Sequence, residues 1–182
     1  MFLYRDPVKN IVSIQSMVGS VPKFITRRFM SMMMEKMFGG LSPDPLTEQN
    51  AINDVTESLK RGDDQVMAIV FFILHILCYL KGKGDTNIKV HTIKYEDILS
   101  NPKDELEKIV CFLNKQKDIN DYSSCLEAMN KDSQEKSENI SKEKLAAFKK
   151  KNPITQELVD KIDRYFNDYG LPPSRNFDSV FS

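Results

Sequence analysis

The chain has 182 residues, enough for one domain with a sizeable core, and its formal net charge is +0. Because the charges balance, no overall field favours nucleic acid or an anionic membrane, so any anion site must be local. Among its three cysteines, Cys78 and Cys111 lie in apolar helical runs, and none has metal-ligand spacing with a histidine. We therefore expect reduced, buried thiols and no disulfide framework.

The first thirteen residues, MFLYRDPVKNIVS, predict an apolar strand, a turn at Asp6-Pro7 and a helix that runs to about Val18. Asp6 can cap this helix, and Pro7 suits its first turn, where a missing N–H costs nothing. Arg5, the N–H groups at the helix start and Ser13 together outline an anion site. The alternative is that Arg5 simply pairs with Asp6 or another nearby carboxylate.

The next segment, residues 24–38, is rich in methionine and carries apolar side chains at helical spacing. Such a stripe is expected to be adaptable packing, with a flexible wall around an apolar acceptor as the alternative. Gly39-Gly40 predicts a break, and residues 42–46 predict a loop. Thr47 is expected to cap a helix over residues 50–59.

The most apolar run, Val66–Leu80, is shorter than the roughly 20 residues that span a bilayer, so we expect no transmembrane segment in this chain. Being apolar on all sides, it predicts a helix buried in the core, which residues 82–85 should end with a turn. His75 lies within it and is expected to be a core histidine with a hydrogen-bond partner, not a catalytic base.

A second strand is predicted from Ile88 to Ile93, and it leads into Tyr95-Glu96-Asp97. Residues 100–102 resemble a cap and first turn, followed by a helix with apolar side chains from Leu106 to Leu113. The order of strand, helices and strand favours parallel pairing between Phe2–Tyr4 and about Lys89–Ile93.

The C-terminal third changes character. Residues 130–151 are densely charged, and we expect a solvated, flexible loop with a short exposed helix, in which Lys149–Lys151 is surface and not a phosphate contact. From Ile154 an amphipathic helix is predicted, with Thr155 as its cap and Gly170 near its end. Its apolar face comprises Leu158, Ile162 and Phe166.

Two segments together resemble the sulfotransferase family, which takes its sulfate from 3'-phosphoadenosine 5'-phosphosulfate. Arg5 and Ser13 match the family's pattern of strand, Arg, Asn or Asp, Pro, and a Ser eight residues after the Arg. Tyr95-Glu96-Asp97, then Asn101-Pro102 and Phe112-Leu113, match its second pattern. The resemblance runs from Phe2 to about Met129. It implies a helix-dominated α/β fold, a partial P-loop-like fold with a short parallel strand pair and flanking helices, in one domain over residues 1–182.

The resemblance also implies roles for particular residues. Arg5 and Ser13 would hold the 3'-phosphate, and Tyr95 would contact the adenine, with anchoring of the strand by its hydroxyl as the alternative for Tyr95. The family's Ser-Phe-x-x-Met segment has its nearest match at residues 125–129. There Leu126 and Met129 would line the adenine pocket, although Leu126 keeps an apolar wall without a stacking ring.

The family's Gly-rich loop with its lysine does not occur in this sequence, nor does its late Arg-Lys-Gly element. The loop and the general base would precede Phe2. We therefore expect a C-terminal part of a sulfotransferase that is inactive by itself, with no catalytic residue assigned, whose complete form sulfates a hydroxyl or amine. A non-catalytic nucleotide-binding or protein-interaction module and an unrelated helical protein are the alternatives. The acceptor, the oligomeric state and the compartment (cytoplasm, or Golgi lumen with an upstream anchor) stay open.

Overall fold

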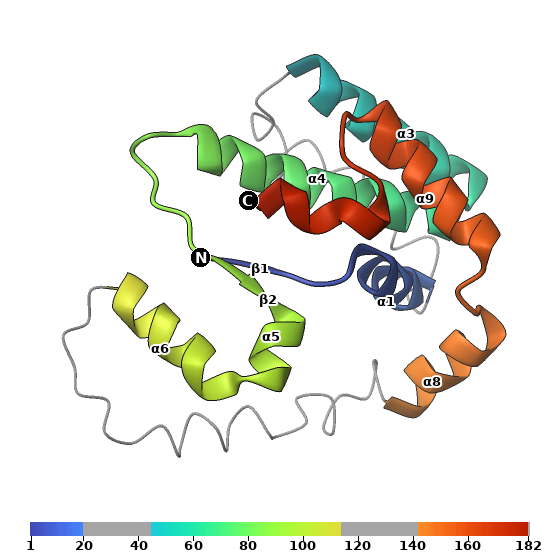
Figure 1. The fold of residues 1–182 in the computed structure, drawn as a ribbon. Helices are drawn as coiled ribbons and strands as arrows, with labels where there is room; N and C mark the ends of the chain where they lie inside the picture. The colour runs from blue at the N-terminus through green and yellow to red at the C-terminus, as the bar shows by residue number, and fades with distance from the viewer. Residues whose placement is uncertain (20–44, 114–141, 182) are drawn as a thin grey trace.

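The computed structural model describes residues 1–19, 45–113 and 142–181 of the chain. A long helix, α4 (Asp64–Gly84), runs through the middle of the molecule. Three helices pack against it: α1 (Pro7–Gly19), α3 (Pro45–Arg61) and α9 (Gln156–Asp168), as Figure 1 shows. The methionine-rich segment and the break at residues 39–44 lie outside the described residues, so those expectations stay predictions.

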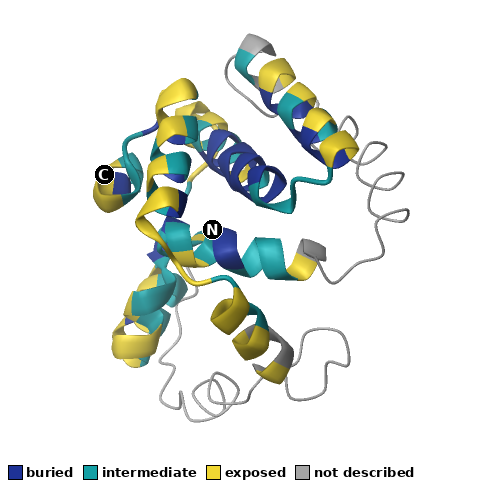
Figure 2. Ribbon diagram, turned by 90° about the vertical axis from the view of Figure 1, so that its right-hand side faces the viewer, coloured by how far each residue is buried: buried dark blue, intermediate teal, exposed yellow. Residues whose placement is uncertain are grey.

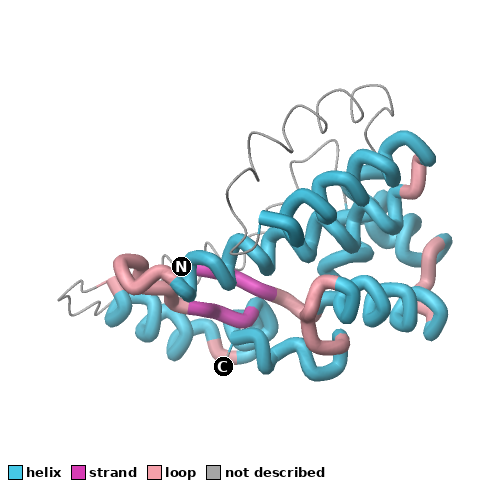
Figure 3. Tube along the Cα trace, turned by 90° about the horizontal axis from the view of Figure 1, so that it is seen from above, coloured by secondary structure: helices cyan, strands magenta, loops and turns pink. Residues whose placement is uncertain are grey.

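The sheet has two short parallel strands, β1 (Phe2–Tyr4) and β2 (Thr92–Lys94), which lie side by side in Figure 3. Their register pairs Phe2 with Thr92 and Tyr4 with Lys94. The predicted parallel pairing is therefore confirmed, and the unrelated helical protein loses its support. The prediction that the second strand begins at Ile88 is wrong, because β1 offers only three residues to pair with.

Helix α4 begins at Asp63, whose side chain accepts hydrogen bonds from Gln65 N at 3.2 Å and Val66 N at 3.0 Å. It continues to Gly84, through the residues that were expected to turn, and Asp85 N closes its last turn on the carbonyl of Lys81. With 21 residues it is long and apolar enough to cross a membrane, yet 61% of its most apolar window is buried in the structure. That burial is typical of a core helix, and Figure 2 shows it among the most buried parts of the fold.

The core has two parts. One joins α1, α4 and α9 with a C-terminal 3-10 helix, η1 (Ser174–Phe181), around the fully buried Ile73 and Phe166. The other joins α3 to the first half of α4 around Val55 and Met67. Leu158, Ile162 and Phe166 are buried as predicted, and Thr155 caps α9 by accepting a hydrogen bond from Leu158 N at 3.2 Å.

Several helix boundaries differ from the prediction. Helix α3 begins at Pro45, so Thr47 lies inside it and is no cap; the fixed φ of proline suits a first helical turn. A short helix that was not predicted, α5 (Tyr95–Ser100), directly follows β2. It is followed by α6 (Pro102–Phe112), which has its proline in the first turn. The charged C-terminal segment contains an exposed helix, α8 (Lys142–Lys151), and its residues before 142 lie outside the described part.

Two expectations of burial are wrong. His75 is exposed, although its Nδ1 donates to the Phe71 carbonyl at 2.8 Å, as the expected backbone partner requires. Cys111 is also exposed, on α6, and Cys78 is only half-buried on α4. Helical spacing gives the period of an apolar stripe, but it does not say which part of a long helix its neighbours cover.

Candidate functional site

The candidate site lies at the carboxyl edge of the strand pair. Because Tyr4 and Lys94 are register partners, the residues that follow them, Arg5 and Tyr95, emerge at the same edge. Ligands of open α/β sheets bind outside this edge. The guanidinium carbon of Arg5 lies 5.0 Å from the ring centroid of Tyr95, within the range of a cation–π contact. The fold thus brings together the cation of the first motif and the aromatic ring of the second.

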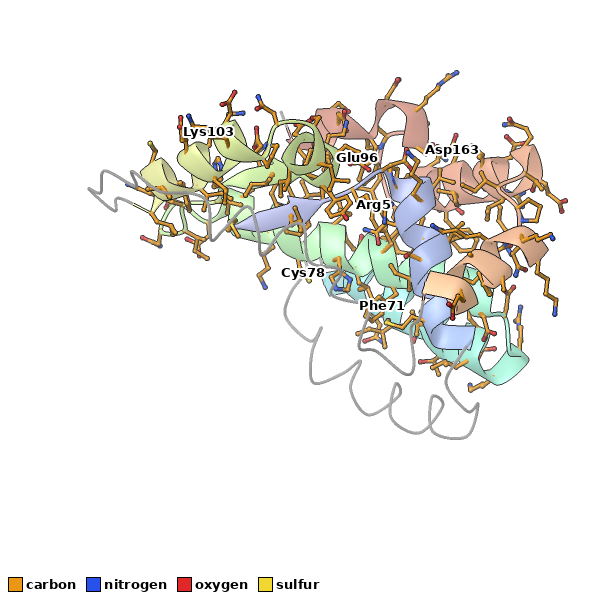
Figure 4. The ribbon with its side chains drawn as sticks, turned by 90° about the horizontal axis from the view of Figure 1, so that it is seen from below. Arg5, Phe71, Cys78, Glu96, Lys103 and Asp163 are labelled. Carbon is orange, nitrogen blue, oxygen red and sulfur yellow. The ribbon has the colours of Figure 1, made fainter. Side chains whose placement is uncertain are left out.

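Glu96, the second residue of α5, is the carboxylate of this site. Its Oε1 lies 3.7 Å from Arg5 Nε and accepts a hydrogen bond from Asp6 N at 3.4 Å. Figure 4 shows Arg5 and Glu96 next to each other, where the chain passes from β1 into α1. Arg5 Nε and Glu96 Oε2 are both buried, and neither has a hydrogen-bond partner. The alternative given for Arg5, pairing with a nearby carboxylate, is therefore supported, with Glu96 as the partner.

The start of α1 is already engaged by the chain's own carboxylates. Asp6 caps the helix as predicted, because its Oδ1 accepts a hydrogen bond from Lys9 N at 2.9 Å. The backbone N–H of Asp6 itself points to Glu96. One cation and two carboxylates therefore meet here. A phosphate at this point would have to bind mainly through the terminal nitrogens of Arg5.

The contacts of the described residues give less support to the roles predicted for the other site residues. Ser13 is half-buried on α1, about 9 Å along the helix from Pro7 at the usual rise per residue. Within the described part of the chain, no hydrogen bond joins Ser13 to Arg5 or Tyr95. The hydroxyl of Tyr95 makes no hydrogen bond there either, so its anchoring role has no support. Leu126 and Met129 lie outside the described residues, and their roles stay predictions.

The C-terminal segment closes one face of the strand pair, which the sequence did not indicate. Phe181 of η1 stacks on Tyr4 with ring centroids 3.7 Å apart, and Asp178 pairs with Lys94. Burial raises the pKa of Tyr4, and the carboxylate of Asp178 raises it further. The hydrogen bond to Asp178 raises the pKa of Lys94 and holds its ammonium group. The ammonium group of Lys94, at the end of β2, is thus bound by Asp178.

Hollows lined by described residues include one next to the strand pair and one beside α3. A cavity of about 240 Å³, mostly apolar, lies between β1, α1 and α4, and its lining includes Leu3, Phe71 and His75. A polar cavity of about 410 Å³ lies between α3 and the end of α9 and includes Asp54 and Tyr169. No group of three metal-binding side chains occurs among residues 1–19, 45–113 and 142–181. Lys149–Lys151 are exposed, as predicted.

The arrangement is that of an α/β protein with a cation and an aromatic ring at the carboxyl edge of a parallel sheet. A family model described as the sulfotransferase domain matches residues 1–176. The chain therefore belongs to the sulfotransferase family. The match reaches well past Met129, where the resemblance was expected to fade, in keeping with the packing of α9 and η1 against the core. Neither a comparison with curated proteins nor one with solved structures gave a match.

Sequence reasoning missed the contribution of Glu96, Asp178 and Phe181. The position of Glu96 near Arg5 could have been predicted from the sequence, because parallel pairing of the two strands places the residues after Tyr95 opposite those around Arg5. Opposite charges at such paired positions favour an ion pair. Nothing in the sequence indicated that Phe181, more than 80 residues beyond β2, returns to the strands.

Proposed function

We propose that this chain binds the 3'-phosphoadenosine part of a sulfate-donor nucleotide at the edge formed by Arg5 and Tyr95. One observation carries the proposal: a guanidinium and an aromatic ring from two distant motifs meet 5.0 Å apart, where both parallel strands end. A nucleotide of this type offers a phosphate for the first and a purine for the second.

The residues present fit this part of the donor, 3'-phosphoadenosine 5'-phosphosulfate. Arg5 has a buried Nε without a hydrogen-bond partner and a side chain that is 34% exposed, so its fork can reach a ligand. Ser13 is proposed as a second phosphate donor. Tyr95, Leu126 and Met129 are proposed to contact the base. When bound, the donor supplies the sulfuryl group that a complete enzyme passes to a hydroxyl or amine.

The groups that would act on the sulfuryl end are not found. The sequence has no Gly-rich loop with lysine to stabilise the leaving oxygen. His75 donates to a backbone carbonyl of α4, and the ring of His91 stacks on Phe112 with centroids 5.0 Å apart. We therefore propose that the chain by itself binds the nucleotide without transferring sulfate. In this first candidate the chain is a part of a sulfotransferase whose complete form is active. The same observations favour a second candidate, a nucleotide-binding or protein-interaction module on the sulfotransferase scaffold that has no transfer activity in any form.

Binding is tested by calorimetric titration with 3'-phosphoadenosine 5'-phosphate. We expect weak binding by the wild type. Arg5→Ala should weaken it by about 2–3 kcal/mol, because a charge-assisted contact to phosphate is lost. Arg61→Ala is the matched control, since Arg61 is 77% exposed at the end of α3 and pairs only loosely with Glu57 at 3.7 Å. Equal affinities of wild type and Arg5→Ala would refute the site.

Transfer is tested with labelled phosphosulfate donor and a panel of phenols, alcohols, amines and sugars. We expect background turnover, because losing even one donor to the developing charge costs about 10²–10³ in rate. Turnover that persists through purification and disappears in His75→Ala or His91→Ala would contradict this expectation. Such a result would mean that the chain carries a catalytic group of its own.

A further inference from the structure

We propose that Glu96 is a positioning residue that orients the Arg5 guanidinium so that its terminal nitrogens face a nucleotide phosphate. The inference rests on the proposed nucleotide site and assigns a role in it to a residue that does not touch the ligand. Three features of Glu96 support this role: its contact with Arg5, its contact with the backbone of Asp6, and its place next to Tyr95 on α5.

The contacts are directional. Among the described residues, the only ion pair of Arg5 is to Glu96, and it involves Nε and not the terminal nitrogens. Nε is fully buried, although the Arg5 side chain as a whole is 34% exposed. The exposed area therefore belongs to the other atoms of the side chain. A carboxylate on the Nε side leaves the opposite side of the planar fork for a bidentate phosphate.

Two further contacts limit the movement of the pair. The Oε1 atom that faces Arg5 also accepts the hydrogen bond from Asp6 N at 3.4 Å, so the carboxylate is tied to the backbone next to Arg5. Tyr95 lies 5.0 Å from the guanidinium and restricts its plane. Arginine has several freely rotating bonds, and a fork held by its neighbours loses less entropy when a ligand binds.

The proposal makes a prediction whose sign is opposite to that of simple electrostatics. Removing a negative charge 3.7 Å from Arg5 should strengthen anion binding if Glu96 acts only through its charge. If Glu96 positions Arg5, its removal should weaken binding, because the guanidinium is then free to turn away. Loss of a supporting partner costs 10–100-fold in affinity at metal sites, and we expect about tenfold here.

The experiment titrates 3'-phosphoadenosine 5'-phosphate into the full chain and its variants. Glu96→Ala should bind about tenfold more weakly, and Glu96→Gln, which keeps the acceptor for Asp6 N, about threefold more weakly. Glu57→Ala is the control for charge, since Glu57 is an exposed partner of Lys60 and Arg61 on α3. It should leave the affinity unchanged. If Glu96→Ala does not fold, Glu96→Gln alone decides the sign.

An Arg5→Lys background tests whether Glu96 acts through Arg5. Lysine keeps the charge but has no Nε and no fork, so Glu96→Ala should have little effect on affinity there. Solvent exchange of the Arg5 Nε–H, measured by NMR on the ligand-free chain, gives a reading that needs no nucleotide. It should be faster in Glu96→Ala than in the wild type, because that N–H is buried beside Glu96.

Each result has one meaning. Equal or tighter binding by Glu96→Ala or Glu96→Gln overturns the proposal, and so does an equal loss of affinity in the Arg5→Lys background. Unchanged exchange of the Arg5 Nε–H overturns it as well. Faster exchange combined with an Arg5→Ala variant of unchanged affinity refutes the nucleotide site itself and reduces Glu96 to a structural ion pair.

Discussion

Replacing Phe166 by alanine tests whether the C-terminal helix belongs to the same folding unit as the candidate site. Phe166 is completely buried, and its ring lies 5.8 Å from that of Phe72 on α4 and 5.0 Å from that of Phe177 on η1. Truncation of a buried phenylalanine costs about 3–5 kcal/mol, which includes the cavity left behind. Against a total stability of about 5–15 kcal/mol, the loss would be easy to measure.

The assay is urea unfolding followed by far-UV circular dichroism. With a slope of about 2 kcal/mol/M, the midpoint should fall by about 2 M in a single cooperative transition. Leu99→Ala is the control, because Leu99 is 64% exposed on α5 and should change stability by less than about 0.5 kcal/mol. A loss below about 1 kcal/mol for Phe166→Ala, or a transition that splits in two, would refute the single domain.

Two further predictions concern single hydroxyl groups. Ser13→Ala should weaken nucleotide binding by about 1 kcal/mol in calorimetry, as expected for a neutral donor, and unchanged affinity would remove Ser13 from the site. Tyr169 donates a hydrogen bond to Asp54 at 2.7 Å, and burial, with this bond, raises the pKa of Tyr169 well above its usual 10.0. The folded state then keeps the phenol proton above pH 10, where the unfolded state releases it, so the free energy of unfolding should fall as the pH rises beyond about 10. Tyr169→Phe should show a smaller fall in urea titrations at pH 8 and 10.5, and identical pH dependence in both proteins would contradict this assignment.

Local signals in the sequence predicted the parts of the site that depend on neighbouring residues. The β1 strand, the Asp6 cap and the helix after Pro7 follow from residue types at adjacent positions, and the structure has all three. The parallel strand pair was also predicted, because the order of strand, helices and strand favours a parallel crossover. The meeting of Arg5 and Tyr95 at one edge then follows from the register.

The features that sequence reasoning missed depend on contacts between distant segments. His75 was expected in the core because its helix is apolar on all sides, but burial depends on which neighbours pack there. The return of Phe181 to the strands joins residues that no periodicity relates. The early start of α3 at Pro45 is different, since proline suits both a loop and a first helical turn, and its sequence context did not decide between them.

The charge balance of the site limits what Arg5 can do alone. Glu96 places a carboxylate 3.7 Å from Arg5 Nε, the Asp6 carboxylate caps the helix that follows, and the ammonium group of Lys94 is bound to Asp178. A phosphate dianion at this edge would therefore meet a local environment that is not positive overall. Binding energy has to come from directed hydrogen bonds and from contact with the Tyr95 ring, and much less from net attraction. This is the physical reason to expect weak affinity, and it explains why the orientation of one guanidinium should matter so much here.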